Sequence, residues 1–248
     1  MKVDLSGKVA LVTGASRGIG KAIAVAMARS GASVGVNYRT SEMEAAETVK
    51  EIESLGVRAA AFKADVGDQN QVEIMLAGIE STFGRLDILV NNAGVTRDAL
   101  LLQMGEGDWE EVLRINLWGV YHCSKAAAKG MVLRRWGRII NLSSIAATMG
   151  RKGQTNYSAS KGAIDAFTRS LAAELGAKGV TVNSIAPGLI VTDMTRGILP
   201  FAESWVRERI AVRRPGTAAD VAPLTVFLAS EGADYITGQV IAVDGGLI

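Results

Sequence analysis

Tyr157 and Lys161 have the spacing of a proton donor and a supporting cation on one turn of a helix. The stretch that holds them reads Asn-Tyr-Ser-Ala-Ser-Lys from residue 156, and a helix-forming run follows it. Side chains at i and i+4 share one face of a helix, so the phenol and the ammonium would meet. A nearby cation would lower the pKa of the phenol from about 10 toward neutrality, as general acid–base chemistry requires. An amphipathic packing pair has the same spacing and is the alternative.

Two further side chains could act beside this pair. Ser144 follows a predicted strand, thirteen residues before Tyr157, and could donate a hydrogen bond to a substrate carbonyl. Asn116 lies inside a long helical run, where asparagine is a poor helix former, and could bind a water or a backbone carbonyl. The alternative for Asn116 is a polar side chain that faces solvent. The single histidine, His122, gives no argument for a metal site and is expected to pack in a helix.

A glycine-rich loop lies between the first predicted strand and the first predicted helix. It reads Thr-Gly-Ala-Ser-Arg-Gly-Ile-Gly over residues 13–20, with the glycine spacing G-x-x-x-G-x-G. Glycines let the backbone approach a pyrophosphate, and the helix N-terminus adds N–H donors and positive potential. The loop therefore predicts nucleotide binding, and a turn made only for close packing is the alternative.

The end of the second predicted strand favours NADP(H) over NAD(H). An NAD site has a carboxylate there for the ribose 2′-hydroxyl, but this strand ends Asn-Tyr-Arg-Thr over residues 37–40. Arg17 and Arg39 could both face a 2′-phosphate, which a guanidinium suits. Asp65 could accept a hydrogen bond from the adenine amino group or cap a local turn. The run Asn-Asn-Ala-Gly over 91–94 is read as a ribose contact or as an asparagine-rich turn.

Short β-branched runs alternate with longer helical runs along the chain. This order predicts an α/β, single-domain Rossmann fold over residues 1–248: a doubly wound parallel sheet of about seven strands with helices on both faces. Residues 188–215 break the rhythm and are predicted to form a helical flap over the ligand crevice. The predicted strands are 9–13, 33–37, 58–63, 86–90, 137–142, 180–186 and 239–243, and the predicted helices are 19–30, 42–55, 70–83, 108–133, 157–175 and 218–229.

Composition narrows the class of protein. The net charge of +2 gives no electrostatic case for nucleic acid or an anionic membrane as a partner. The N-terminus has no apolar core of a signal peptide, and no run of about 18 apolar residues predicts a transmembrane helix. Cys123 is the only cysteine, so an intrachain disulfide is impossible, which fits a reducing compartment. A cytoplasmic location is therefore expected.

Together, these motifs resemble the short-chain dehydrogenases/reductases over essentially the whole chain. The matching positions are 13–20, 91–94, Asn116, Ser144, 157–161 and 187–188. Within that family, the stretches 91–98, 153–157, 187–194 and 235–239 are most similar to the bacterial enzymes that reduce 3-oxoacyl thioesters of acyl carrier protein. Val212 to Gly216 and residues 197–207 depart from that subgroup, and we expect them to affect acyl-chain preference and not the chemistry.

The resemblance implies a role for each matching side chain. Tyr157 would donate a proton to the carbonyl oxygen, Lys161 would lower the pKa of Tyr157 and hold the nicotinamide ribose, and Ser144 would polarise the carbonyl. Asn116 would hold a water that links Lys161 to solvent. The substrate would also meet Gln154, and no metal is required. The residues expected to contact NADP(H) are Gly14, Ser16, Arg17, Gly18, Ile19, Gly20, Arg39, Asp65, Val66, Asn92, Ala93, Gly94, Tyr157, Lys161, Pro187, Gly188, Ile190 and Thr192.

The activity implied by the resemblance is NADPH-dependent reduction of a 3-oxoacyl thioester to the 3-hydroxyacyl thioester in fatty acid biosynthesis. Acetoacetyl-CoA reduction, or reduction of another ketone, is the alternative with the same chemistry. A non-catalytic NADP sensor is the alternative from a different class. Such a sensor would be expected to lose Tyr157 or Lys161, and this chain keeps both.

The resemblance also implies partners. Similar enzymes are homotetramers, and the run 159–171 carries small and apolar residues on more than one face, as a helix covered on both sides would. An acidic acyl carrier protein needs a basic rim, which Lys129, Arg134, Arg135 and Lys178 could form. Arg135 and Lys178 are the expected contacts, and scattered solvated side chains are the alternative.

Overall fold

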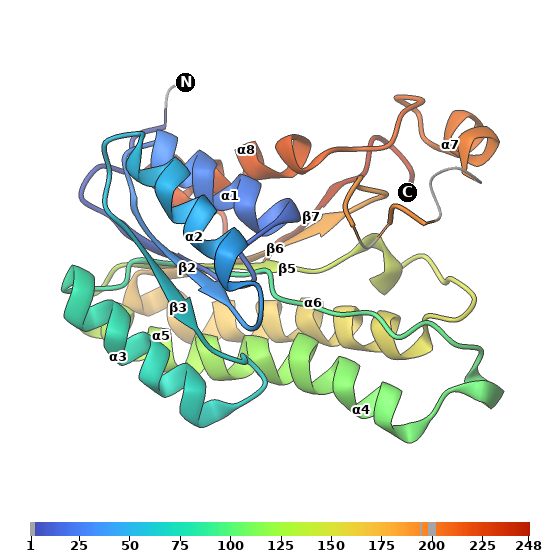
Figure 1. Ribbon diagram of the computed structural model, residues 1–248, viewed down its shortest axis with the longest axis horizontal. Helices are drawn as coiled ribbons and strands as arrows, with labels where there is room; N and C mark the ends of the chain where they lie inside the picture. The colour runs from blue at the N-terminus through green and yellow to red at the C-terminus, as the bar shows by residue number, and fades with distance from the viewer. Residues whose placement is uncertain (1–2, 194, 198–201) are drawn as a thin grey trace.

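A seven-stranded parallel sheet runs through the middle of the protein (Figure 1). The computed structural model describes residues 3–193, 195–197 and 202–248. The strand order is β3-β2-β1-β4-β5-β6-β7, so the winding direction changes between β1 and β4. This confirms the predicted doubly wound sheet. The strands are β1 (Val9–Val12), β2 (Ser33–Tyr38), β3 (Ala59–Lys63), β4 (Ile88–Asn91), β5 (Gly137–Leu142), β6 (Val180–Pro187) and β7 (Val240–Val243).

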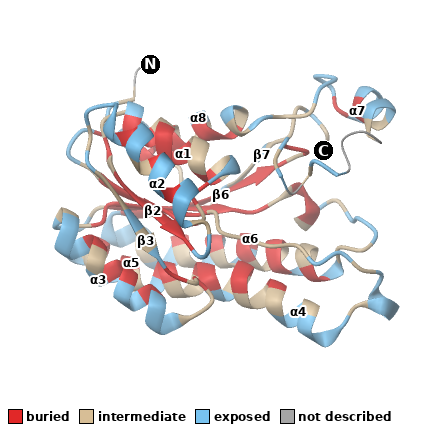
Figure 2. Cartoon of the chain, viewed as in Figure 1, coloured by how far each residue is buried: buried red, intermediate tan, exposed pale blue. Residues whose placement is uncertain are grey.

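Helices cover both faces of the sheet (Figure 1). One layer consists of α1 (Gly18–Arg29), α2 (Glu42–Glu53) and α8 (Ala218–Ala229). The other consists of α3 (Gln69–Phe83), α5 (Gly119–Arg134) and α6 (Thr155–Leu175), with α4 (Glu106–Leu113) packed beside α6. In Figure 2 the buried residues gather where these helices meet the strands. No helix in the described ranges is long and apolar enough to cross a membrane.

The apolar strands supply two separate cores, one for each face of the sheet. Successive strand residues point to opposite faces, and all four residues of β1 are buried. Ala10 and Val12 pack into the core beneath α1 and α8, whereas Val9 and Leu11 pack into the core beneath α3 and α5. This two-sided burial explains why the strands read as continuous apolar runs and not as alternating ones.

The predicted single helix over 108–133 is wrong in one respect. α4 ends at Leu113, a π-helical turn spans Arg114–Trp118, and α5 then continues the same rod. A π-helical turn holds an extra residue compared with an α-helical turn and often marks a functional site. Asn116 lies in the middle of this turn and is fully buried. Its side chain therefore does not face solvent, which excludes the alternative considered for it.

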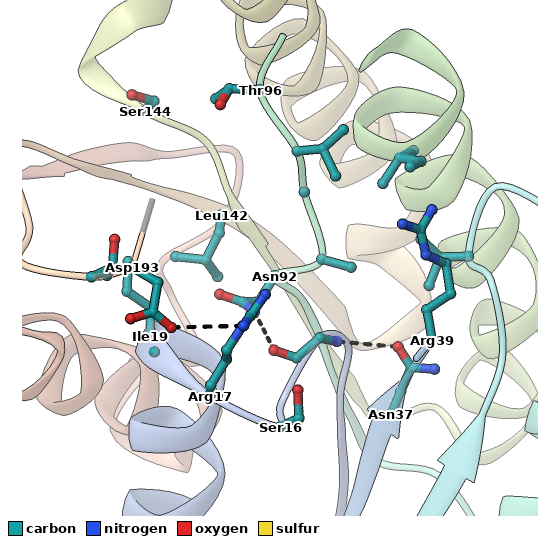
Figure 3. A pocket seen from close by; sticks show the side chains of 18 of the residues that line it. Ser16, Arg17, Ile19, Asn37, Arg39, Asn92, Thr96, Leu142, Ser144 and Asp193 are labelled. Atoms are coloured by element: carbon teal, nitrogen blue, oxygen red, sulfur yellow. Dashed lines mark hydrogen bonds and ion pairs between the residues drawn. The ribbon is translucent and has the colours of Figure 1, made fainter. Parts of the chain in front are cut away.

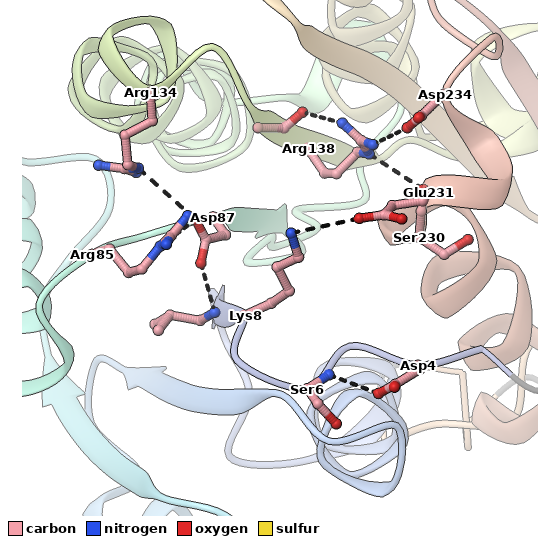
Figure 4. A network of polar contacts seen from close by, with 12 residues as sticks. Asp4, Ser6, Lys8, Arg85, Asp87, Arg134, Arg138, Ser230, Glu231 and Asp234 are labelled. Carbon is pink, nitrogen blue, oxygen red and sulfur yellow. Dashed lines mark hydrogen bonds and ion pairs between the residues drawn. The ribbon is translucent and has the colours of Figure 1, made fainter.

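Polar groups join the strands at the amino edge of the sheet (Figure 4). The carboxylate of Asp87 is completely buried, accepts the backbone N–H of Val9 at 3.0 Å, and pairs with Arg85 at 2.7 Å. Arg138, also buried, donates to the carboxylate of Asp234 and stacks its guanidinium 4.3 Å from the ring of Trp136. These charges are satisfied by neighbouring protein groups, so this edge serves stability.

The stretch between β6 and α8 contains a short helix, α7 (Glu203–Arg209). Residues 194 and 198–201 of the predicted flap lie outside the described residues. The stretch from Val212 to Gly216 leads into α8, where Arg214 makes a two-point ion pair with Asp220 at 2.8 and 2.9 Å. Thr217 and Asp220 complete a capping box at the start of α8. Hydrogen bonds from Arg214 and Thr217 hold the pKa of Asp220 far below its usual range, so Arg214 supports a helix N-terminus.

Candidate active site

A cleft of about 570 Å³ opens at the carboxyl edge of the sheet (Figure 3), where the strand order changes. Ligands of open α/β sheets bind at this position. The structure brings most of the predicted contact residues into this one cleft. Those that line it are Gly14, Ser16, Arg17, Gly18, Ile19, Arg39, Asp65, Val66, Asn92, Ala93, Gly94, Ser144, Tyr157, Lys161, Pro187, Gly188, Ile190 and Thr192.

The glycine loop between β1 and α1 is held from two neighbouring strands (Figure 3). Gly14 and Gly18 have φ angles of 60° and 59°, the left-handed region that favours glycine. Asn37, at the end of β2, accepts the N–H of Gly14 at 3.1 Å. Asn92, after β4, donates its side-chain amide to the carbonyls of Thr13 and Gly14 at 2.9 and 3.1 Å. The loop is therefore fixed before any ligand arrives.

Sequence reasoning missed the part that Asn37 plays. Its side chain accepts from Gly14 and donates to the carbonyls of Phe62 and Ala64 at 3.2 and 3.1 Å. The signal was a polar residue that ends an otherwise apolar buried strand, a position that requires hydrogen-bond partners. Asn37 thus couples β2 and β3 to the glycine loop.

Gly20 is the predicted cofactor contact that does not line the cleft. A Cβ atom on Gly20 would lie 2.4 Å from the carbonyl oxygen of Gly14 and 2.5 Å from the amide nitrogen of Asn92. The absence of a side chain therefore allows α1 to pack against the loop. Gly20 serves the close packing of helix and loop, a role different from the predicted direct contact.

Arg17 and Arg39 both line the cleft (Figure 3), and each has a carboxylate nearby. Arg17 lies 3.7 Å from Asp193, and Arg39 lies 3.8 Å from Asp65. Both arginine side chains remain about half exposed. Exposed pairs at such distances are weak, so either arginine can turn to a phosphate.

Asp65 takes the turn-capping position that was one of its two expected roles. One carboxylate oxygen accepts the N–H of Gly67 at 2.9 Å, and the other accepts from Arg114 at 3.0 Å. Burial raises the pKa of Asp65, but the hydrogen bonds from Arg114 and Gly67 and the charge of Arg39 outweigh burial and lower it. Asp65 is therefore a firmly ionised anchor beside Arg39.

The pair predicted from helical spacing lies at the start of α6 and faces the cleft. The Nζ atom of Lys161 is 5.5 Å from the ring centre of Tyr157. Ser144, two residues after β5, lines the cleft beside Tyr157, lowers the pKa of the Tyr157 hydroxyl, and accepts the N–H of Ala146 at 3.1 Å. A phenol, a hydroxyl and an ammonium thus converge where a carbonyl substrate would need them.

The pKa of Tyr157 does not follow the prediction. It lies above its usual value because burial raises it, and the charge of Asp98 adds to that effect. The Ser144 hydroxyl and the charge of Arg151 lower the pKa of Tyr157, but not enough to reverse the direction. The sequence pattern showed the nearby cation and could not show the burial that outweighs it.

Lys161 is buried to 4 % exposure, and its Nζ donates to the carbonyl of Leu142 at 2.6 Å. Burial lowers the pKa of its ammonium to about 8, and the charge of Asp165 acts in the opposite sense. The ammonium lines the cleft beside Tyr157, so ribose hydroxyls can reach it there.

Asn116 sits behind this pair and bonds to protein groups. Its side-chain oxygen accepts the N–H of Val95 at 2.8 Å, and its amide donates to the carbonyl of Val95 and to Ser160, both at 3.1 Å. The π-helical turn therefore fixes the loop segment that follows Gly94. The predicted water relay through Asn116 stays a prediction.

A second cavity, of about 120 Å³, adjoins the first at Ser144 and Tyr157. The predicted substrate residue Gln154 lines it and donates to Asp98 at 2.9 Å. Charged, polar and apolar side chains share its wall. The other lining residues are Thr96, Ile145, Ala146, Met149, Arg151, Gly188, Leu189, Thr195, Trp205 and Leu247.

Arg135 and Lys178, the expected carrier contacts, lie away from this cleft. Arg135 follows the end of α5 and Lys178 precedes β6, so both are at the amino edge of the sheet. Arg135 adopts a left-handed φ of 53° and donates to the carbonyl of Ala177 at 3.2 Å. Arg135 therefore contacts the residue just before Lys178, but one copy of the chain does not bring the two to its own site.

No group of three or more His, Cys, Asp or Glu side chains within the described residues could hold a metal ion. His122 instead packs against the rings of Trp118 and Tyr121, with centroids 5.8 and 5.6 Å away. Its Nδ1 atom lies 3.2 Å from the carbonyl of Val66. These contacts are those of a helix-packing residue.

The fold and the cleft define a Rossmann-type oxidoreductase that binds a dinucleotide. A family model described as enoyl-(acyl carrier protein) reductase matches residues 14–248. The chain belongs to the short-chain dehydrogenase/reductase family, which confirms the resemblance seen in its motifs.

Several named relatives share nearly the full length. The 3-oxoacyl-[acyl-carrier-protein] reductase FabG of Staphylococcus aureus is 46% identical over 240 residues, covering 97% of this chain and 98% of the relative. The 3-oxoacyl-[acyl-carrier-protein] reductase of Synechocystis is 47% identical over 245 residues, covering 98% of both chains. Among solved structures, the gluconate 5-dehydrogenase of Burkholderia cenocepacia, in complex with NADP and tartrate, has a TM-score of 0.95 and 34% identity, with coverage of 99% and 97%.

Proposed function

We propose that this protein is an NADPH-dependent reductase of 3-oxoacyl thioesters on acyl carrier protein, acting in fatty acid biosynthesis. The observation that carries the proposal is the convergence of Tyr157, Ser144 and Lys161 at one end of a cleft whose other end holds two arginines. Relatives 44% to 47% identical over almost the whole chain carry the name of this activity. The product would be the 3-hydroxyacyl thioester.

Tyr157 is the proton donor in this proposal. Its raised pKa keeps the phenol protonated at neutral pH, so Tyr157 already carries the proton that it donates when the substrate binds. Ser144 holds the substrate carbonyl with a hydrogen bond, which directs that oxygen toward the phenol. A bound nicotinamide supplies the hydride, and the protein supplies position and electrostatics.

Lys161 has two tasks, because it lines the cleft beside Tyr157. It holds the ribose hydroxyls of the cofactor, and it stabilises the phenolate left after proton transfer. A proton then returns to Tyr157, and a water at Asn116 is the proposed link to solvent. That link requires a change in the contacts of Asn116, since Val95 and Ser160 now occupy its amide.

The cleft fits NADP(H). The φ angles of Gly14 and Gly18 allow the loop backbone to pass close to a pyrophosphate at the N-terminus of α1. Arg17 and Arg39 supply planar donors for the 2′-phosphate, and Asn37 at the end of β2 carries no charge that would repel it. The structurally similar gluconate 5-dehydrogenase was solved with NADP.

A second candidate is reduction of a small polar ketone. The cavity beside Tyr157 is lined by Arg151, Asp98 and Gln154, which suit a hydroxylated or acidic substrate as well as a thioester. The 34% identical gluconate 5-dehydrogenase acts on a sugar acid by name. Acetoacetyl-CoA is the remaining alternative, because it presents the same 3-oxoacyl group.

Steady-state kinetics with three ketone substrates, each measured with NADPH and with NADH, test the proposal. We expect kcat/KM with NADPH to be highest for acetoacetyl-carrier protein, lower for acetoacetyl-CoA, and lowest for 5-ketogluconate. NADH should support much slower turnover of each. A preference for 5-ketogluconate would favour the second candidate, and no turnover of any ketone would favour a sensor.

We further propose that the protein is a cytoplasmic homotetramer. A single buried cysteine, free of disulfides, supports a reducing compartment. Contact of an acidic carrier with Arg135 and Lys178 would lie at the amino edge, so the carrier would deliver its thioester to the cleft of another copy. Sedimentation of the purified protein measures the number of copies.

A further inference from the structure

Lys161 is a buried cation whose hydrogen-bond partner is neutral. Its side chain donates to the backbone carbonyl of Leu142. Within the described part of the chain, no carboxylate lies within 4.0 Å of its Nζ. Burial of an ammonium is costly unless an opposite charge compensates it. The neighbourhood of Lys161 therefore needs a negative group at somewhat longer range.

Asp165 is that group. It follows Lys161 by one turn on α6, so the two side chains share a face of the helix. It is only 5 % exposed, and one of its oxygens accepts the hydroxyl of Ser184 at 2.9 Å. Ser184 lies on β6 and is fully buried, so the carboxylate is held against β6, the strand whose last residue, Pro187, lines the cleft.

Apart from Asp165, the groups around Lys161 carry no compensating charge. Tyr157, also on α6, is neutral when protonated. From the end of β5 come Leu142 and Ser143, and from β6 comes Ser184, none of which is charged. Asp98 and Arg151 act on Tyr157 from the substrate side.

We propose that Asp165, fixed by Ser184, is a positioning residue of this active site: it keeps Lys161 charged so that Lys161 can hold the ribose and support Tyr157. The inference rests on the proposed function for its catalytic consequence, but its electrostatic part belongs to the resting protein. Asp165 acts through Lys161 and needs no contact with substrate.

The physical reason is a balance of two opposite effects on one group. Burial has already lowered the pKa of Lys161 to about 8, and Asp165 raises it. Without the Asp165 charge, the pKa would fall toward neutral pH. A substantial share of the molecules would then have a neutral Lys161 at pH 7.5, with weaker hold on the ribose and no cation beside Tyr157.

The test is a direct titration of Lys161 in the cofactor-free protein. Lysine labelled with ¹³C at Cε is followed by NMR against pH, and the Lys161 signal is identified by its loss in Lys161→Met. We expect a midpoint near 8 in the parent and a midpoint roughly one pH unit lower in Asp165→Asn. The asparagine oxygen can still accept the Ser184 hydroxyl, so the variant is expected to fold.

A second variant keeps the test valid if Asp165→Asn does not fold. Asp165→Leu combined with Ser184→Ala replaces the polar pair by apolar groups and leaves no buried hydroxyl unpaired. It should shift the Lys161 midpoint in the same direction. Thr168→Val is the matched control, because it removes a buried hydroxyl on the same helix, bonded to Asn141 at 2.9 Å, without removing a charge. Its Lys161 midpoint should equal that of the parent.

Activity supplies the second readout. The alkaline limb of kcat/KM should move to lower pH in Asp165→Asn by the same amount as the NMR midpoint, and KM for NADPH at pH 8 should rise several-fold. Equal Lys161 midpoints in the parent and in both charge-removing variants would overturn the inference. If the Lys161 midpoint is lower in the variants than in the parent, but the parent reduces no ketone, the proposed function is refuted and the electrostatic assignment stands.

Discussion

Burial changes the pKa values of Tyr157 and Lys161 in opposite directions. It raises the pKa of the phenol and lowers the pKa of the ammonium, so both groups are shifted toward their neutral forms. A protonated Tyr157 is what a reductase needs at the start of its cycle. The Lys161 ammonium beside it is the group that can lose its charge, because its pKa of about 8 lies close to neutral pH.

Tyr157→Phe should separate proton transfer from cofactor binding. The phenyl ring keeps the shape of the side chain but cannot donate a proton, so kcat should fall by about 10²- to 10⁴-fold. The dissociation constant for NADPH, measured by fluorescence, should change little because Lys161 still lines the cleft. Undiminished turnover would show that another group is the acid.

Lys161→Met should abolish most activity and yet stabilise the fold. The folded-state pKa of about 8 lies below the usual 10.5, so the charged form of Lys161 opposes folding. Removing the charge should raise the free energy of unfolding by about 1 to 3 kcal/mol at pH 7. Some of the gain is lost because the Leu142 carbonyl loses its donor.

The stabilisation by Lys161→Met should depend on pH in a defined way. It should be complete below pH 8 and fade as pH rises from about 8 toward 10.5, because above that range both folded and unfolded parent chains hold a neutral lysine. Urea titrations at pH 7 and pH 10 measure the difference. A constant difference across this range would contradict the assigned cost of burial.

Replacing Arg17 and Arg39 together by alanine should change cofactor preference. Each lies in the cleft with only a distant carboxylate, and a charge-assisted hydrogen bond contributes about 1.5 to 3 kcal/mol. KM for NADPH should therefore rise at least about tenfold, and KM for NADH should change far less. Equal effects on both cofactors would show that other residues contact the 2′-phosphate.

At the residue scale, the sequence showed which side chains meet but not how strongly each is perturbed. The i, i+4 spacing was enough to place Tyr157 and Lys161 on one face. The raised pKa of Tyr157 depends on its burial and on the charge of Asp98, a residue far from Tyr157 in the sequence. Asp165 gave no motif, because its significance comes from the packing of α6 against Ser184 on β6.

At the scale of single elements, the π-helical turn between α4 and α5 was the main feature that could not be predicted. Helix-forming residues run without a break from Asp108 to Leu133, and their pattern does not show where one turn widens. The turn brings Asn116 to Val95 and Ser160, so it joins three segments behind the site. The helix itself was predictable, and its local widening follows from tertiary contacts.

Gly20→Ala should damage the cofactor end through α1. The added Cβ would lie 2.4 Å from the Gly14 carbonyl, so the helix and the glycine loop must separate. We expect a loss of about 1 to 3 kcal/mol in stability and at least tenfold weaker NADPH binding. Gly107→Ala is the control, because a Cβ there meets no atom within 4 Å in α4. Thermal unfolding and NADPH titration of both variants provide the comparison.

Over the whole molecule, stability and chemistry occupy opposite edges of the same sheet. The amino edge holds the network around Asp87 and Arg138, and the carboxyl edge holds the cleft (Figures 3 and 4). Alternation of strands and helices in the sequence was enough to predict this sheet and to place Ser144 and the glycine loop at one edge. The same topology places Arg135 and Lys178 at the other, which motif resemblance alone did not show.

Asp87→Asn should destabilise the protein and leave its kinetics intact. The carboxylate is fully buried and holds Arg85, Arg134 and the N–H of Val9, so the amide would leave cations unpaired. We expect a loss of about 2 to 4 kcal/mol in the free energy of unfolding. KM for NADPH at 20 °C should equal that of the parent, and a raised KM would show that the two edges are coupled.

The strand order also determines which parts of the site can form first while the chain is being synthesised. The strands β3-β2-β1-β4 are contiguous in the sheet, and all are complete by Asn91. A chain emerging from the ribosome can therefore pair four strands and form the glycine loop before Ser144, Tyr157 or Lys161 has been made. Until β5 arrives, β4 presents a free edge, so the nascent protein is most open to aberrant pairing when its cofactor loop is already built.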